Sequence, residues 1–527
     1  MRFFNTAGPV NSKDHYCLLP LQRMHIEEIE HLIGQKQYFV LHAPRQTGKT
    51  SCLLALMEYL NKRDDYRCLY VNVESAQAAR ENVKGGIKAI LNEIASRASF
   101  FLKDDFLKNY WLKIFKESGE YAALTEILSL WSKESDKPLV LLIDEIDSLV
   151  GDTLISVLRQ IRSGYDKRPA EFPQSIILCG VRDVRDYRLH SAREKAIITG
   201  GSAFNIKAKS LRLGDFSRAE VEELYQQHTQ ETGQRFSKEA IEAVWEYTNG
   251  QPWLVNALGY EVCFEMKEYR DRSIEITADM ITEAKENIII RRDTHIDQLA
   301  DKLQEERVRR VIEPILAGES FEQDFIPDDI QYLIDLGLIK QKRNGEICIA
   351  NKIYQEVIPR QLSWGTQSGI AIQQSWYIKP DSSLDMDKLM RSFQEFFREH
   401  SEHWVERFQY KEAGPQLLLQ AYLQRIVNSG GRVEREYGLG RMRTDLLVSW
   451  PYEGGVQKIV IELKVLYKTL EETIIKGCEQ TAEYMDKSNA REGHLVIFDR
   501  REGISWEEKI FQQEKQIGAK TIKIWGM

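Results

Sequence analysis

The chain has 527 residues and a formal net charge of -8, from 72 Lys and Arg against 80 Asp and Glu. This length predicts three or four domains. The net negative charge excludes a protein that binds nucleic acid through a generally basic surface, so any contact with DNA must come from a local basic patch. The sequence has no run of eighteen apolar residues and does not begin like a signal peptide, which predicts a cytoplasmic protein without a membrane partner.

Residues 1–36 are predicted to form an arm and then a helix over roughly 24–34, with Arg23 directly before the helix. The residues of this arm leave its role open. It is either a plain packing element or a cover over a ligand bound nearby.

A strand, a tight loop and a helix are predicted between Gln37 and Leu60. Residues 38–41 form a short apolar run typical of a strand, and apolar residues recur at helical spacing from Leu53. The loop between them, Ala43–Thr50, follows the phosphate-binding pattern G-x-x-x-x-G-K-[ST] apart from its first position. Backbone N–H groups and the dipole at the start of a helix attract phosphate, so this loop predicts a phosphate site.

The residue types in the loop indicate a nucleotide and Mg²⁺. Lys49 can reach the outer phosphates, and the Thr50 hydroxyl can ligate the metal. Ala43 stands where the pattern has glycine, so the loop either enters without a positive φ or bears about 1 kcal/mol of strain. The alternative is a chance surface turn that ends in Gly-Lys-Thr. The candidate binding residues are Ala43, Thr47, Gly48, Lys49, Thr50 and Ser51.

A second element supports the same ligand. Residues 139–143 form a fully apolar run that ends in Asp144 and Glu145, and a buried parallel strand delivers such carboxylates to the crevice where ligands bind. Asp144 is then the Mg²⁺ partner, usually through water, and Glu145 is placed to polarise the water that attacks the γ-phosphate. The alternative is an apolar strand with a solvated acidic end.

Further strands and helices complete a doubly wound parallel sheet. Strands are predicted at 68–73 and 175–180, a helical insert at 76–133 and a helix over about 152–163. Arg182, just after the strand at 175–180, is the candidate sensor of the γ-phosphate, with a solvated loop arginine as the alternative. Arg185 and Arg193 are fallback candidates, in the same chain or from a neighbouring subunit of a homo-oligomer.

Three short motifs carry a family resemblance that covers roughly residues 1–360. Residues 202–206, 213–217 and 249–256 resemble the AAA+-related, STAND-like bacterial and archaeal ATPases, within the additional-strand class of P-loop proteins. The resemblance implies ATP as the ligand, an ATPase core at 1–215, and a helical lid at 216–300 with the Gly250–Pro252 turn near the nucleotide. Several such ATPases place an N-terminal arm over the adenine, which makes Arg23 a candidate contact of the base.

Residues 301–362 predict a winged-helix module. A helix containing Pro314 should bend or end at that proline, and a hairpin is predicted around Asn344-Gly345. The module could bind DNA through Lys340, Lys342 and Arg343, but packing between domains is favoured. A linker is predicted at 363–384, within a linker-and-helix segment at 363–403.

The remaining residues, 404–527, hold a different kind of site. After a helix, three strands are predicted, and period-two alternation places Glu462 and Lys464 on the same face of the third. Asp445, on the neighbouring strand, can join them. Two carboxylates around one divalent ion, with an ammonium group beside it, suit phosphodiester hydrolysis. The alternative is solvated strand charge. The helix is predicted at 416–426, the strands at 432–437, 444–448 and 458–465, and a loop at 451–455.

The ordered set Asp445, Glu462-x-Lys464 and Gln480-x-x-x-Tyr484 resembles the PD-(D/E)XK nuclease superfamily, in its RecB-like branch. The resemblance implies a C-terminal α/β restriction-endonuclease-like fold, DNA as the substrate, and Mg²⁺ between Asp445 and Glu462, for which Mn²⁺ may substitute.

Other residues around this set are less certain parts of the resemblance. The proline that names the motif is replaced by Thr444, a position where substitution is routine in the family. Glu412 matches the helix glutamate, with Glu436 as its competitor. Four nearby arginines form either a phosphate-attracting patch or ordinary surface charge. They are Arg432, Arg435, Arg441 and Arg443.

Together these patterns predict an ATP-hydrolysing protein whose nucleotide state controls a Mg²⁺-dependent DNA endonuclease. A setting in bacterial genome defence or mobile-element biology rests on analogy alone. The alternative is a STAND-type signalling and oligomerising ATPase scaffold whose C-terminal domain binds DNA or protein without cutting.

Overall fold

The computed structural model describes residues 1–182, 188–191, 196–199, 204–291, 299, 301–317, 327–342, 345–369, 377–407, 413–427, 431–438, 443–466, 469–501 and 503–527. These residues form two compact units, here taken one at a time. The first contains Met1–Lys285 and Asp335–Gly337, and the second contains Glu286–Ile334 and Leu338–Met527. No helix of the described ranges is long and apolar enough to cross a membrane.

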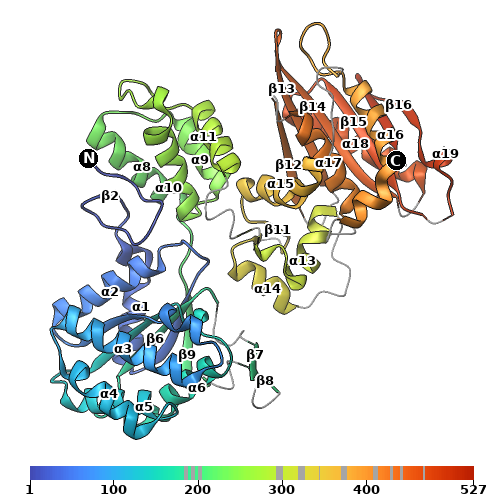
Figure 1. Ribbon diagram of the computed structural model, residues 1–527. Coiled ribbons are helices and arrows are strands. Elements are labelled where there is room, and N and C mark those ends of the chain that lie inside the picture. Colours follow the sequence, from blue (N-terminus) through green and yellow to red (C-terminus); the bar gives the residue numbers. More distant parts are fainter. Residues whose placement is uncertain are drawn as a thin grey trace. The chain divides into compact units, whose positions relative to one another are not determined.

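A five-stranded parallel sheet forms the centre of the first unit (Figure 1). Its strand order is β4-β5-β6-β3-β9, so β6 lies between the strands that carry the two nucleotide motifs. This order places the carboxyl ends of β3, β5 and β6 side by side, at the edge where parallel sheets bind ligands. The strands are β3 (Tyr38–His42), β4 (Arg67–Asn72), β5 (Leu139–Asp144), β6 (Ser175–Gly180) and β9 (Lys207–Arg212).

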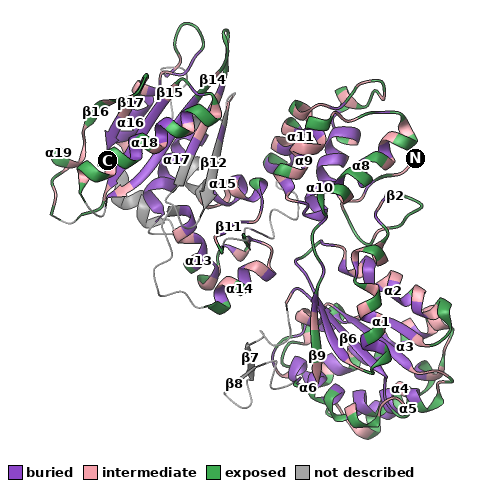
Figure 2. Cartoon of the chain, turned by 180° about the vertical axis from the view of Figure 1, so that it is seen from behind, coloured by how far each residue is buried: buried purple, intermediate pink, exposed green. Residues whose placement is uncertain are grey.

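Helices cover both faces of this sheet because its inner strands are apolar on both sides. Successive residues of β5 enter different cores: Leu141 packs with α3, α5 and α6, and Leu142 packs with α1 and α2. The predicted doubly wound sheet is thus confirmed, and its strands β3, β4, β5 and β6 are largely buried, whereas the edge strand β9 is mostly exposed (Figure 2). The helices are α1 (Ile26–Gly34), α2 (Lys49–Arg63), α3 (Val83–Leu102), α4 (Phe106–Ser118), α5 (Ala123–Glu134) and α6 (Gly151–Ser163), and a hairpin of β7 (Arg188–Ser191) and β8 (Ala196–Thr199) follows β6.

A helical segment follows β9, and we call its residues Phe216–Glu265 the lid. Ser217 begins the first helix with a capping box, in which its side chain and that of Glu220 each bond the other's backbone N–H. Pro252 opens the third helix at a position where a missing N–H costs nothing. The helices are α8 (Arg218–Thr232), α9 (Lys238–Thr248) and α10 (Pro252–Tyr260), with the π-helical turn η6 (Glu261–Glu265) after them and α11 (Ala278–Arg291) further on.

The N-terminal arm, residues 1–25, packs against the lid. Its two short parallel strands, β1 (Phe3–Phe4) and β2 (His15–Tyr16), place Phe4 4.9 Å from Tyr225 of α8, measured between ring centroids. A side chain at Gly259 of α10 would collide with the Phe4 ring, since its Cβ would lie 2.8 Å from it. The packing role left open by the sequence is therefore real.

The second unit begins with helices and a small hairpin. Pro314 lies inside α13, so of the two predicted outcomes, a bend or an end, the helix does not end at this residue. Helix α15 continues to Gly369, and the segment predicted as a linker from residue 363 therefore starts as helix. The elements are α13 (Glu306–Ala317), α14 (Pro327–Asp335), β10 (Ile339–Gln341), β11 (Ile347–Ile349), α15 (Lys352–Gly369), α16 (Met386–Arg407) and α17 (Gly414–Val427).

A six-stranded mixed sheet completes this unit, in the order β12-β13-β14-β15-β17-β16. The first three strands form an antiparallel meander, and helix α18 then crosses to β15, which is parallel to β14. The predicted loop at 451–455 is wrong in extent, because β13 continues to Tyr452 and β14 begins at Gly455. The elements are β12 (Arg432–Gly438), β13 (Arg443–Tyr452), β14 (Gly455–Leu466), α18 (Leu470–Ser488), β15 (Glu492–Asp499), α19 (Trp506–Lys509), β16 (Gln512–Ile517) and β17 (Lys520–Gly526).

Candidate functional site

The phosphate-binding loop joins the end of β3 to the start of α2. Gly48 has a φ of 91° and caps the helix, a conformation that a side chain would strain. Gln46 also has a positive φ, of 58°, whereas Ala43 does not. The loop therefore enters without the strain that its first position could have imposed, so alanine is compatible with this position.

Lys49 places a buried ammonium group inside this loop. Its Nζ donates to the carbonyl oxygens of Ala43 and Pro44, each at 3.0 Å, and the side chain is 6% exposed. Thr47 braces the loop by donating its hydroxyl to the Pro44 carbonyl at 2.8 Å. A cation held at the N-terminus of a helix forms a site for an anion such as a phosphate group.

Asp144 is the fully buried carboxylate at the end of β5. Its Oδ2 accepts hydrogen bonds from the Thr50 hydroxyl at 2.7 Å and the Tyr70 hydroxyl at 3.0 Å, and its Oδ1 accepts the Glu145 N–H at 3.0 Å. A hydroxyl and a carboxylate in contact are the hard oxygen donors that Mg²⁺ prefers. Thr50 and Asp144 therefore fit the metal that the sequence assigned to them.

Glu145 follows Asp144 in a left-handed conformation, with a φ of 57°. A non-glycine residue in this region stores strain, and such residues gather at functional sites. Burial raises the pKa of the Glu145 carboxyl, and the negative charges of Asp147 and Asp144 add to the rise, while Lys49 and Arg45 oppose it. A carboxylate with a raised pKa is a better general base.

The end of β6 contacts Asp147, one of the acids that surround Glu145. Asp147 Oδ1 accepts the N–H of Val181 at 3.2 Å, and a Cβ at Gly180 would lie 2.6 Å from that oxygen. Arg182, the residue after Val181, is half-buried. It follows β6, which lies between β3 and β5 in the sheet. Its position suits the predicted sensor role. Arg185 and Arg193 lie outside the described residues.

Arg23 connects the phosphate-binding loop to the segment that leads into the lid. Its guanidinium donates to the Thr47 carbonyl at 2.7 Å and to the Gly214 carbonyl at 2.9 Å, and it lies 4.6 Å from the centre of the Phe216 ring. A cavity of about 40 Å³ lies beside it, enclosed by the N-terminal arm, the start of α2 and the lid. Arg23 thus forms part of the cavity wall next to Gly48.

Tyr70 contacts the site although no sequence pattern indicates it. It comes from β4, whose pairing with β5 brings the phenol to Asp144. Replacing Tyr70 by phenylalanine should lower ATP turnover by about 10- to 150-fold, because a hydrogen bond to a charged group is worth roughly 1.5–3 kcal/mol. Asp144 keeps its bond from Thr50. Turnover measured against Mg²⁺ concentration tests this. Tyr38→Phe, which removes a buried hydroxyl bonded to the Pro173 carbonyl, is the control, and equal turnover in both variants would contradict the role.

The second charged cluster is buried in the C-terminal sheet. Glu462 is fully buried and Lys464 is 9% exposed, and Lys464 Nζ donates to Glu462 Oε1 at 2.5 Å. Val460 and Leu466, which share their face of β14, pack against α18. The acid and the amine therefore face α18, which carries Gln480 and Tyr484.

The other members of the predicted set are placed less completely. Asp445 is directly opposite Glu462 in the register of β13 and β14, and the side chain of Asp445 lies outside the described residues. Gln480 has a buried Oε1 with no hydrogen-bond partner among the described residues. Glu412 also lies outside them, as do the side chains of Glu436 and of the four arginines.

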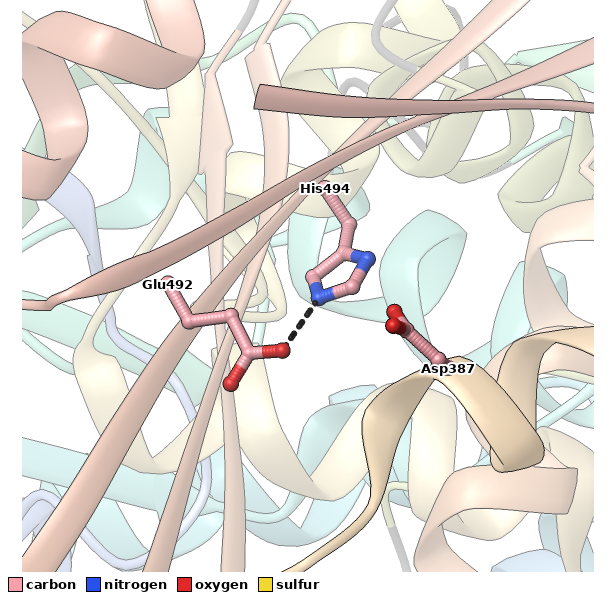
Figure 3. Close-up of side chains that lie close together, drawn as sticks. All are labelled: Asp387, Glu492 and His494. Carbon is pink, nitrogen blue, oxygen red and sulfur yellow. Dashed lines mark hydrogen bonds and ion pairs between the residues drawn. The ribbon is translucent and has the colours of Figure 1, made fainter. Parts of the chain in front are cut away.

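A third cluster, of Asp387, Glu492 and His494, has the spacing of a metal site but not its chemistry (Figure 3). The Trp525 indole, which can only donate, donates to Nδ1 of the buried His494 at 2.9 Å. The proton of the neutral ring therefore lies on Nε2, 3.1 Å from Glu492 Oε1. Lys523 donates to both oxygens of Asp387 at 2.6 Å. Since these bonds occupy the groups that would hold a metal, the cluster is a structural network.

The phosphate-binding loop, the buried aspartate with its neighbouring glutamate, and the parallel sheet define a P-loop ATPase. The chain belongs to the AAA-like domain family, which matches residues 12–358. The matched residues end before the C-terminal sheet.

Several solved structures are similar to the chain. The Walker-type ATPase PABY2304 of Pyrococcus abyssi is 15% identical over 67% of this chain and 99% of its own, with a TM-score of 0.48. Cdc6p from Pyrobaculum aerophilum is 14% identical over 66% of this chain and 95% of its own, with a TM-score of 0.37. The RuvB Holliday junction branch migration motor of Thermotoga maritima is 14% identical over 63% of this chain and 94% of its own, with a TM-score of 0.32. No curated protein matches the chain.

Proposed function

We propose that this ATPase is a nucleotide-switched nuclease, in which the C-terminal sheet cleaves DNA and the nucleotide state of the P-loop controls that cleavage. The observation that carries the proposal is the buried pair of Glu462 and Lys464 on the face of β14 toward α18, with Asp445 opposite in register. Burying an ion pair usually gives less stability than apolar packing would. A pair in this setting is therefore better explained by chemistry than by stability.

The surrounding fold supports the same reading. A helix, an antiparallel meander, a crossing helix and a parallel strand follow one another as α17, β12–β14, α18 and β15. This sequence of elements puts Asp445, Glu462 and Lys464 on adjacent strands and Gln480 on the helix above them. Gln480 Oε1, buried without a partner among the described residues, is available to a ligand at that place.

Each residue has a defined task in the proposed reaction. Asp445 and Glu462 would hold a divalent cation, Mg²⁺ or Mn²⁺, which when bound supplies an acidic water and offsets charge on the phosphate. Lys464, whose Nζ already lies at Glu462, stabilises the negative charge that grows on the phosphoryl oxygens. Gln480 and Tyr484 orient the strand backbone or the water from α18.

The ATPase module supplies the proposed control. A switch from a mostly closed to a mostly open arrangement needs about 5.5 kcal/mol of difference in nucleotide binding between the two states. The contacts of Lys49 and Thr50 with the γ-phosphate and its Mg²⁺, with Arg182 as a sensor and Glu145 as the base, are the source of that difference. Helices α13 and α14 with the β10–β11 hairpin would act as a winged-helix connector. A homo-oligomer and a role in genome defence fit this architecture.

Cleavage of supercoiled plasmid in Mg²⁺ tests the proposal. Wild type should cut, while Glu462→Gln and Lys464→Met should each lose about 100-fold or more in rate, as expected when a group that stabilises transition-state charge is removed. Lys458→Met, on the same face of β14 but exposed, should cut like wild type. Thermal unfolding of each variant separates loss of chemistry from loss of fold.

The same assay with ATP, ADP, a non-hydrolysable ATP analogue and no nucleotide tests the control. Rates should differ among these four conditions in wild type and become equal in Lys49→Ala. If folded wild type binds DNA but does not cut it with either Mg²⁺ or Mn²⁺, the nuclease proposal is contradicted. The alternative, a signalling scaffold, would then be favoured. Cutting at one rate under all four conditions would leave a nuclease without nucleotide control.

A further inference from the structure

The cavity beside the phosphate-binding loop is placed to receive the base of a bound nucleotide. Gly48 and Ser51 form its wall on the side of the loop and α2, so a ligand with its phosphates at Lys49 reaches the cavity with its nucleoside end. Tyr16 of the arm and Phe216 and Leu224 of the lid supply apolar walls. Such walls suit the flat faces of a purine.

The polar residue of interest in this wall is Asn256, on helix α10 of the lid. Its side chain is only 9% exposed, and its Nδ2 donates to the Pro252 carbonyl at 2.8 Å. A carbonyl oxygen accepts only a donor, so this bond fixes which end of the amide is nitrogen. The other end, Oδ1, is buried and has no hydrogen-bond partner within the part of the chain that the structure describes.

A buried acceptor without a donor is costly, and a ligand that brings a donor removes that cost. Two other polar side chains of the wall are already engaged: Ser51 Oγ accepts the Val10 N–H at 2.9 Å, and Arg23, which can only donate, bonds the Thr47 and Gly214 carbonyls. Asn256 Oδ1 therefore selects for a base that presents an N–H group.

We propose that Asn256 Oδ1 accepts a hydrogen bond from the exocyclic 6-amino group of adenine, and that Asn256 determines the preference of the site for ATP over GTP. The proposal rests on nucleotide binding at the P-loop. Guanine carries a carbonyl oxygen at the same position, and two acceptors facing each other repel. Asn256, which recognises the base, thus lies on the lid, whereas Lys49 and Thr50, which bind the phosphates and the metal, lie in the core.

The walls of the cavity come from the N-terminal arm, α2 and the lid. A base bound there would contact all three, and Asn256 is its polar contact on the lid.

Competition binding against a fluorescent ATP analogue tests the proposal, using ATP, GTP and purine riboside triphosphate, which has hydrogen in place of the 6-amino group. Wild type should bind ATP about tenfold more tightly than purine riboside triphosphate, the value of one buried hydrogen bond, and more tightly still than GTP. Asn256→Leu should bind ATP about tenfold less tightly and purine riboside triphosphate unchanged. Gln226→Leu, an exposed amide on the lid helix α8, is the control and should behave like wild type.

Equal affinity of wild type for ATP and purine riboside triphosphate would overturn the proposal, and it needs no variant to fold. A loss of affinity in Asn256→Leu that is the same for both nucleotides would also overturn it, since it would show a packing role only. Failure of the ATPase assignment looks different, because wild type would then bind none of the nucleotides and Lys49→Ala would change nothing.

Discussion

Lys49→Ala is expected to weaken ATP binding by about 100-fold or more, because charge-assisted contacts to phosphate in a buried site are among the strongest single contacts in a protein. The ammonium is 6% exposed and lies between the loop carbonyls of Ala43 and Pro44. No neighbouring side chain is placed to take over from it among the described residues of the loop, since Arg45 is exposed.

Calorimetric titration with ATP and Mg²⁺ measures this effect. Lys62→Ala removes the same group from the other end of α2, where the side chain is 80% exposed, and should bind like wild type. If Lys49→Ala keeps wild-type affinity while remaining folded, the loop is not the phosphate site.

Glu145→Gln is expected to keep ATP binding and to lower hydrolysis by about 10²- to 10⁴-fold, the usual contribution of a general base. The amide has the size of the carboxylate but cannot take a proton from water, and Lys49, Thr50 and Asp144 remain in place for the phosphates and the metal. Phosphate release in single-turnover conditions measures the chemical step. Wild-type turnover in Glu145→Gln would show that another group is the general base.

The pH dependence of hydrolysis gives a second test of the same residue. Since burial, Asp147 and Asp144 raise the pKa of Glu145, the active deprotonated form is lost as pH falls, and at a higher pH than for an ordinary glutamate. Asp147→Asn removes one of these charges and can keep the bond to the Val181 N–H. This variant should retain activity to lower pH than wild type, and an unchanged acid limb would show that Glu145 does not set it.

The nucleotide site could be predicted from local sequence because the residues that form it are consecutive in the chain. Gly48, Lys49 and Thr50 are neighbours in the chain, and a strand before them and a helix after them suffice to aim their backbone at one point. The β5 strand and its acids were recognised in the same way, since a fully apolar run followed by two carboxylates is typical of a buried parallel strand that ends at a ligand crevice. The doubly wound sheet followed from counting such strands.

Pairs that depend on strand register were predicted only in part. Alternation along one strand placed Glu462 and Lys464 together, but only the pairing of β13 with β14 places Asp445 opposite Glu462. Whether these residues form a nuclease site stays a prediction. Of the two outcomes predicted for Pro314, the end of the helix does not occur, since apolar residues on both sides of the proline are buried. The loop at 451–455 is shorter than predicted because β13 and β14 stay paired as far as Tyr452 and Gly455.

The sequence by itself determined the phosphate-binding loop and the two acids at the end of β5, since each depends on residues close together along the chain. The tertiary structure alone decided that Tyr70 supports Asp144, that Arg23 connects the loop to Gly214, that Trp525 fixes the proton of His494, and that Asn256 borders the cavity beside Gly48. These residues are 31 or more positions apart in sequence within each hydrogen-bonded pair, and their contacts arise from strand order and packing, which no local pattern records.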